Sequence, residues 1–306
     1  MPRRSYFFLI ALPALLALGF TTARANRHHR SVSISDGHKQ PATDCSDLHI
    51  RFDEQDAVVR SEERTLTKSE APVLRIQPHT NGGVQVVGWD KESYSVTACK
   101  AAAGSGDAAE RILSQITMSI EHGKITTKGP ADEDEWTIYL LIRTPKSASV
   151  DLETMNGPIS LYDVEGKLTA RAHNGPISLK NFSGDAEITA VNGPISLDGS
   201  SGSVRIRTEN GPISVALAGK TWSGAGLTAD AQNGPMTLMV PTGYQSSFVV
   251  ESTNNAPVSC KASICDNARK TWDDNHRRIE YGTAPAVIRL STVNGPVSVR
   301  ESREKL

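Results

Sequence analysis

The amino-acid sequence predicts an all-β protein: a parallel β-solenoid, or β-helix, of coils of about 18 residues, preceded by an irregular N-terminal β cap with one short helix. Three observations predict this fold. A five-residue motif recurs at a constant interval, hydrophobic and polar residues alternate in both halves of each repeat, and aromatic residues make up only 5% of the chain. Repeats that stack on their neighbours bury a continuous, narrow core, which suits small aliphatic side chains better than rings.

The repeated motif is Asn-Gly-Pro-Ile-Ser. It begins at Asn156, Asn174, Asn192 and Asn210, and related sequences begin at Asn233, Asn255 and Asn294. The first four copies are spaced by 18 residues. A meander in a sandwich or barrel is the alternative architecture, but hairpins do not need the same residue at the same place in every unit. Stacked coils lay identical positions above one another, so the constant spacing favours the solenoid, with the asparagines as a structural ladder.

Each repeat contains two stretches with a period of two residues. Ile159 and Leu161 alternate with Ser160, and the residues around Ala170 alternate in the same way, which predicts strands rather than helices. Glycines supply corners with positive φ, and each Pro is expected just after a corner because it lacks an N–H. Insertions into stacked repeats form loops on one side, and the largest is expected at residues 261–282 of a repeat region that spans 151–306.

The first 25 residues have the pattern of a secretory signal peptide. Arg3 and Arg4 precede an apolar run that ends at Phe20, and an Ala-x-Ala sequence ends at Ala25. A membrane anchor is the alternative, but the run is shorter than the roughly 20 residues that span a bilayer. We therefore expect an exported protein, periplasmic, secreted or at the cell surface, with no transmembrane segment in the mature chain.

Residues 26–44 are polar and aperiodic, which predicts a flexible leader. Residues 45–150 then alternate as strands do, apart from a stretch with helical spacing from Asp107 to Ile116, and are expected to form the N-terminal cap and irregular coils. Asn81-Gly82-Gly83 resembles a degenerate copy of the repeated corner. Because open strand edges must be covered, we expect this cap at one end and the charged tail 300–305 at the other.

The chain has four cysteines, all after the signal peptide. An even number in an oxidising compartment favours disulfides over metal ligands or nucleophiles. Three pairings can be drawn; the closeness of Cys260 and Cys265 favours a bond between them, which leaves Cys45 with Cys99. A zinc site would need two close pairs or nearby histidines, and we predict no metal and no cofactor.

The leader, the sequence Val84-Gln-Val-Val-Gly-Trp-Asp90, the Ala-rich helix and the Asn-Gly-Pro-Ile-Ser units resemble the bacterial putative-adhesin family with β-strand repeats, a domain-of-unknown-function family. The resemblance covers about residues 70–300. It implies a right-handed β-helix in an exported or envelope protein, and it brings no catalytic residues to this chain. The chain has a Pro in every corner, whereas the family is associated with Ser-Gly corners. The resemblance therefore does not extend to the turn geometry of these corners.

The charge pattern bears on several classes of function. A net charge of −1 gives no reason to expect a nucleic-acid partner. Carbohydrate-active β-helices need clustered carboxylates on an outer face, whereas the outward column here is Ser160, Ser178, Ser196 and Ser214. The sequence therefore predicts a non-enzymatic, adhesin-like surface protein that binds a glycan or protein of the envelope or exterior, or has a structural role. The alternative is a carbohydrate-binding or polysaccharide lyase-like β-helix.

The least repetitive part of the repeat region supplies the candidate binding residues. They are Trp272, Asp273, Asp274, His276 and Arg277. An exposed aromatic ring beside charged groups can bind a sugar or a protein, although loops are commonly charged. The spacing does not match a calcium loop, so we predict no metal there.

Overall fold

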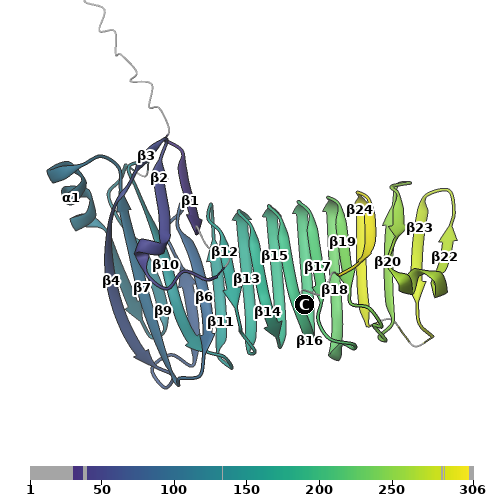
Figure 1. The fold of residues 1–306 in the computed structure, drawn as a ribbon. Helices are drawn as coiled ribbons and strands as arrows, with labels where there is room; N and C mark the ends of the chain where they lie inside the picture. The colour runs from purple at the N-terminus through teal and green to yellow at the C-terminus, as the bar shows by residue number, and fades with distance from the viewer. Residues whose placement is uncertain (1–29, 37–39, 133, 284, 286, 303–306) are drawn as a thin grey trace, which may run out of the picture.

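The structure is a computed structural model that describes residues 30–36, 40–132, 134–283, 285 and 287–302. The predicted signal peptide lies outside these residues. The described chain is all-β with one α-helix, and it forms a small antiparallel sheet and a large, mostly parallel sheet of 22 strands (Figure 1). The predictions of an all-β chain and of parallel pairing are confirmed.

Most of the large sheet consists of two parallel ladders, which together we call the repeat stack. In spatial order, ladder 1 contains β5 (Val73–Gln77), β11 (Ser149–Thr154), β13 (Lys167–Asn174), β15 (Asp185–Asn192), β16 (Ile195–Asn210), β18 (Ser223–Asn233), β24 (Ile288–Asn294) and β20 (Phe248–Thr253). Ladder 2 contains β6 (Gly83–Trp89), β12 (Ile159–Tyr162), β14 (Ile177–Ser183), β16, β17 (Ile213–Leu217), β19 (Met236–Val240), β25 (Val297–Glu301) and β21 (Val258–Cys260). The long strand β16 belongs to both ladders.

Identical positions of successive repeats pair directly. Ile159 lies opposite Ile177, and Ile177 lies opposite Ile195. Alternate side chains point inward, where residues such as Leu179 and Ala170 are fully buried. The two-residue period of the sequence therefore becomes an aliphatic interior and a polar exterior.

The glycines of the Asn-Gly-Pro corners are needed for a different reason from the one predicted. We expected these glycines to have positive φ angles. Of the five corner glycines from Gly157 to Gly234, only Gly193 has a positive φ. A Cβ atom added to Gly175 would lie 2.4 Å from the carbonyl oxygen of Gly157, and one added to Gly211 would lie 2.1 Å from that of Gly193. Because each corner stacks directly on the preceding one, no side chain fits there.

The repeats do not stack in sequence order, contrary to our expectation. The last strands of the chain, β24 and β25, lie between β18 and β20 in ladder 1 and between β19 and β21 in ladder 2. Figure 1 shows the yellow C-terminal strand β24 inside the stack. The outer edge of β20 is already occupied by an antiparallel strand, so the C-terminal strands pair with its inner edge.

Residues 261–282 form a cap for this end of the stack rather than the expected loop. They contain the 3-10 helix η2 (Ser263–Asn267) and a hairpin of β22 (Arg269–Trp272) and β23 (His276–Tyr281). Ala262, Cys265 and Ile279 are buried in the main core, which is why the segment folds back. Of the predicted charged tail, Arg300 and Glu301 belong to β25 within the stack, and residues 303–305 lie outside the described residues.

The other end of the stack carries an N-terminal cap of mainly antiparallel strands. Its strands are β4 (Val58–Thr67), β7 (Ser93–Ala102), β10 (Trp136–Pro145), β8 (Thr117–Glu121) and β9 (Lys124–Lys128). β10 joins the cap to β6, and β9 joins it to β5. The predicted helix is α1 (Gly106–Gln115), whose Ala109 and Leu113 are buried.

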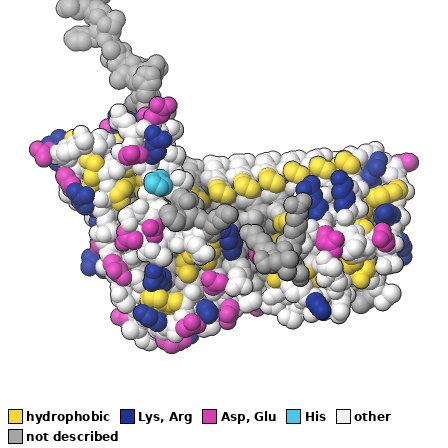
Figure 2. All heavy atoms as spheres, viewed as in Figure 1, with side chains coloured by type: hydrophobic (Ala, Val, Ile, Leu, Met, Phe, Trp, Pro, Cys, Tyr) yellow, Lys and Arg dark blue, Asp and Glu magenta, His cyan; other side chains and the backbone are white. Residues whose placement is uncertain are grey.

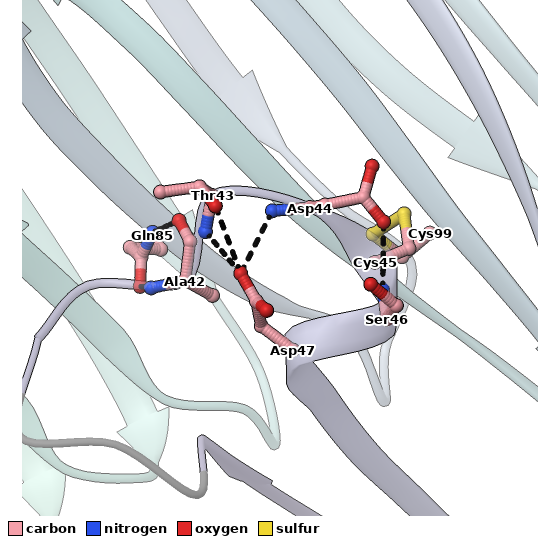
Figure 3. The surroundings of a disulfide bond; sticks show 8 residues. All are labelled: Ala42, Thr43, Asp44, Cys45, Ser46, Asp47, Gln85 and Cys99. Carbon is pink, nitrogen blue, oxygen red and sulfur yellow. Dashed lines mark hydrogen bonds between the residues drawn. A yellow bond between two sulfur atoms is a disulfide. The ribbon is translucent and has the colours of Figure 1, made fainter.

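Part of the predicted flexible leader is ordered. Residues 32–36 form β1 (Val32–Asp36), which pairs with β2 (Leu48–Phe52), and β2 pairs with β3 (Gln55–Asp56). Between β1 and β2, Ala42 is buried and exchanges two hydrogen bonds with the Gln85 side chain, at 3.0 and 2.7 Å (Figure 3). This small sheet covers part of the cap with a second apolar core, and that burial orders the segment.

Both disulfides pair as predicted. Cys45 and Cys99 are joined with a Cα–Cα distance of 5.4 Å, and Cys260 and Cys265 with one of 5.6 Å. The first attaches the small sheet to β7, and the second closes the turn that enters the C-terminal cap. Among the described residues, no helix is long and apolar enough to cross a membrane.

Replacing a stacked glycine is expected to destabilise the fold. Gly211→Ala places a methyl group against backbone, and we expect it to lower the free energy of unfolding by about 1–3 kcal/mol or more. The neighbouring Pro212→Ala, at an exposed position, should cost less than about 1 kcal/mol. Chemical denaturation of the two variants checks this, and equal effects would contradict the steric explanation.

The two disulfides should differ in their contribution to stability. Cys45 and Cys99 are 54 residues apart and Cys260 and Cys265 are 5 apart, so loop-closure entropy predicts losses of about 4 and about 2 kcal/mol when each is removed. Denaturation of the two double Cys→Ser variants measures these losses. A larger loss for the Cys260–Cys265 variant would show that the C-terminal cap, rather than loop entropy, governs the difference.

Candidate functional site

The predicted binding residues lie on the β22–β23 hairpin at the C-terminal end of the repeat stack (Figure 1). Trp272 ends β22, His276 begins β23, and residues 273–275 form the turn between them. The position is set by β23, which pairs antiparallel with β20. The hairpin thus extends beyond the last repeat while remaining anchored to it.

On this hairpin Trp272 is exposed and Arg277 is half-buried. They are directly opposite each other in the β22–β23 pair, and the Arg277 guanidinium lies 6.0 Å from the centre of the Trp272 ring. The tryptophan is 49% exposed, and the Nε of Arg277 is buried without a hydrogen-bond partner. A large ring held beside a cation at the end of the molecule can contact a ligand without rearrangement of the backbone.

His276 and Asp273 lie together on the same hairpin but make mainly internal contacts. Asp273 stabilises the turn, because its carboxylate accepts hydrogen bonds from the backbone N–H groups of Asn275 and His276 at 3.2 and 2.6 Å. The Nε2 of His276 is 3.3 Å from the Glu251 carboxylate. Asp274 is exposed in the turn, and among the described residues it forms no hydrogen bond or ion pair with the other four.

Glu251 was missed by the sequence analysis. It receives a hydrogen bond from Arg278 at 3.1 Å and lies beside His276. Its position on β20 is far from the hairpin in sequence, and only the antiparallel pairing brings them together. Within the described chain, no group of three or more His, Cys, Asp or Glu residues could hold a metal ion.

The predicted asparagine column is a hydrogen-bonded ladder. Each side-chain amide donates to the carbonyl oxygen of its neighbour at 2.7–3.1 Å, in the order Asn81, Asn156, Asn174, Asn192, Asn210, Asn233, Asn294 and Asn254. Asn81, in the degenerate copy of the corner, is the first member of the ladder, a position that was not predicted from the sequence.

The last member of the ladder is Asn254, not Asn255 as predicted. In ladder 1, Ser252 pairs with Thr292, which aligns Asn254 with Asn294. Ladder 2 nevertheless pairs Val258 with Val297, so this corner holds one extra residue. Two consecutive residues with positive φ, Asn254 and Asn255, accommodate it.

The corner prolines and the hydroxyl column run beside the asparagine ladder. Pro176, Pro194 and Pro212 are exposed, and a row of hydrophobic side chains follows one edge of the stack in Figure 2. On ladder 2, Ser178 and Ser196 hydrogen-bond through their hydroxyls at 3.1 Å. These columns repeat uniformly along the stack and hold no convergent acid–base group.

Comparison with known proteins identifies no family for this chain. No family model matches it, and no curated protein matches it. Among solved structures, a "putative adhesin" from Bacteroides fragilis aligns with a TM-score of 0.42 at 9% identity, covering 80% of this chain and 97% of that chain.

Two further structures are similar at the same level. A "putative cell adhesion protein" from Clostridium sporogenes aligns with a TM-score of 0.30 at 9% identity, covering 80% of this chain and 100% of that chain. A "putative lipid binding protein" from Parabacteroides distasonis aligns with a TM-score of 0.30 at 9% identity, covering 80% of this chain and 97% of that chain. Similarity at this level assigns no ligand and no function to this chain.

The hairpin should make the C-terminal cap sensitive to acid. The hydrogen bond from Arg269, together with the charge of Arg278, holds the pKa of Glu280 below its ordinary value of 4.5. A carboxyl group with a lowered pKa stabilises the folded protein at pH values above its ordinary pKa. This stabilisation is lost as the pH falls through the lowered pKa.

We therefore expect Glu280→Gln to reduce the melting temperature near neutral pH and to have a smaller effect at acid pH. Glu187→Gln is the matched control, because Glu187 makes no ion pair within the described part of the chain. Melting curves of both variants between about pH 2 and 7 test the expectation. An effect of Glu280→Gln that does not change with pH would contradict it.

Proposed function

We propose that this chain is an exported, non-enzymatic, adhesin-like protein that presents a binding or structural surface in the cell envelope. The observation that supports this best is the in-register exterior of the repeat stack. Side chains of one kind recur at each repeat along its length, as the asparagine ladder and the hydroxyl column show. Repeat stacks of this kind offer extended surfaces for recognition.

We infer that the two ladders wind as a right-handed parallel β-helix. Successive strands alternate between ladder 1 and ladder 2, and strands within each ladder are parallel. A crossover between neighbouring parallel strands of one sheet is right-handed in about 98% of cases. The right-handed form is also the one that the family resemblance implies.

The disulfides support export. Two bonds use all four cysteines and leave none free, and such bonds persist in oxidising compartments. They agree with the predicted signal peptide of residues 1–25, with placement in the periplasm, at the cell surface or in the medium.

We place the first binding site of this protein at Trp272 and Arg277. Its proposed ligand is a glycan or protein of the envelope or the exterior. The ring is among the most exposed large hydrophobic side chains of the described residues, and aromatic and Arg side chains carry much of the energy of binding surfaces. Carbohydrate binding is the second candidate function, favoured by the same exposed ring. A lyase-like activity has weaker support, because Glu251 is already paired with His276 and Arg278.

The binding role is tested with the mature chain from Asn26 on a glycan array and in pulldowns from purified envelopes. Deleting residues 261–282 would remove the C-terminal cap, so point variants are the sharper test. We expect Trp272→Ala with Arg277→Ala to weaken binding by about tenfold or more. Met155→Ala is the matched control, because Met155 is equally exposed, at 49%, on a different part of the stack.

If the folded wild-type chain captures no partner, the adhesin-like role is wrong and a structural role is the better account. If binding is present but equal in the hairpin variant and the control, the protein binds through another surface. Circular dichroism of each variant establishes that it is folded.

A further inference from the structure

A polar groove of about 490 Å³ lies on the N-terminal cap. Figure 1 shows this cap at the end of the stack opposite β22 and β23. Its floor comes from β4, β7, β10 and β6, and one wall comes from residues 42–44. The residues that line it include Thr65, Trp89, Lys91, Ser95, Thr97 and Arg143.

The outer face of β7 changes character at the edge of this groove. Cys99 and Ala101 belong to the second apolar core, under the small N-terminal sheet. The preceding outward residues, Ser95 and Thr97, line the groove instead. Alternate residues of one strand share a face, so one strand presents an apolar surface where it is covered and hydroxyl groups where it is open. The open half is thus built to face water or a polar ligand.

The wall of the groove is held firmly. Ala42 is fixed by two hydrogen bonds to Gln85, and Cys45 is bonded to Cys99. The Asp47 carboxylate accepts hydrogen bonds from the backbone of Thr43 and Asp44 at 2.8 and 3.1 Å (Figure 3). A ligand entering here would meet a wall that is already ordered, which reduces the entropic cost of binding.

An oriented indole ring with two cations forms one side of the groove. The Nε1–H of Trp89 donates to the carbonyl oxygen of Ser93 at 2.7 Å, which fixes the ring. The Nζ of Lys91 lies 4.8 Å from the ring centre, and the guanidinium carbon of Arg143 lies 5.9 Å from it. The ring and both cations line the same groove.

Neither cation has a carboxylate partner among the described residues. The acidic neighbours of Lys91 in sequence are used elsewhere, because Asp90 pairs with Lys146 at 2.8 Å and Glu92 pairs with Lys68 at 2.9 Å. Two carboxylates also line the groove: Glu63 accepts a hydrogen bond from the Ser95 hydroxyl at 2.7 Å, and Asp44 accepts one from the backbone N–H of Ser46 at 2.9 Å. Two unpaired cations gathered on one ring form a site for an anionic group.

We propose that this groove binds an acidic saccharide. A sugar ring packs against the Trp89 indole, Lys91 and Arg143 bind its carboxylate, and the hydroxyls of Thr65, Ser95 and Thr97 bind its hydroxyl groups. Such a ligand matches the three kinds of group present: an aromatic face, a pair of cations and hydroxyl hydrogen-bonding partners. The site is separate from the Trp272 hairpin and does not depend on it.

The test follows indole N–H signals by NMR while the ¹⁵N-labelled mature chain is titrated with tetramers of galacturonate and of glucuronate. The chain has four tryptophans, and Trp89→Phe assigns the signal of Trp89. We expect the Trp89 signal to shift with at least one acidic tetramer and to shift little with the same tetramer as its methyl ester. Lys91→Gln and Arg143→Gln should each weaken binding by about tenfold or more, as expected for charge-assisted hydrogen bonds.

The matched control is Arg205→Gln with Arg289→Gln. These two arginines also line a polar groove without an ion pair within the described chain, but on ladder 1 and with no indole among the residues that line it. The double variant should bind the acidic tetramers as the wild type does. Trp272→Ala should also bind them as the wild type does, because the groove does not include the hairpin site of the proposed function. The proposal is overturned if neither acidic tetramer shifts the Trp89 signal, if the esters bind equally well, or if the control loses as much affinity.

Discussion

The fold depends on one constraint: each repeat lies directly on another, with identical positions in backbone register. The asparagine amides of neighbouring repeats hydrogen-bond at 2.7–3.1 Å, and the corner glycines approach the carbonyl below them so closely that a Cβ would clash. Any residue that breaks the register at a corner therefore disturbs its neighbours as well. The one corner with an extra residue lies in the outermost repeat and absorbs it with two left-handed asparagines.

A stack of this kind has two open ends, and the protein closes them by different means. The N-terminal end carries antiparallel strands, helix α1 and a small sheet bonded to β7 through Cys45–Cys99. The C-terminal end is closed by η2 and the β22–β23 hairpin, which bury Ala262, Cys265 and Ile279. The two caps also supply surface that does not repeat, and both candidate sites lie at the ends of the stack.

The two sites differ in how their residues are held. At the hairpin, Trp272 and Arg277 meet across a strand pair and the Trp272 ring is exposed, so they suit contact with a large partner. In the N-terminal groove, Trp89 is fixed by a hydrogen bond and the cations lie against it beside an ordered wall, which suits a small polar ligand.

The sequence by itself determined the repeated part of this protein. A strict 18-residue period and alternation of side chains are local signals that leave only one parallel register, so the strands around Ile159, Ile177 and Ile195 and the asparagine ladder could be predicted. The pairing of Cys260 with Cys265 also followed from proximity along the chain, and helix α1 from its spacing.

Only the tertiary structure decided how the ends are built. The insertion of β24 between β18 and β20, the folding of residues 261–282 into a cap, and the ordering of Ala42 by Gln85 depend on contacts between segments distant in sequence. No periodic pattern encodes such contacts, because which strand edge remains free is settled only when the other strands are in place. For the same reason Glu251 and the Trp89 groove could not be found from the sequence.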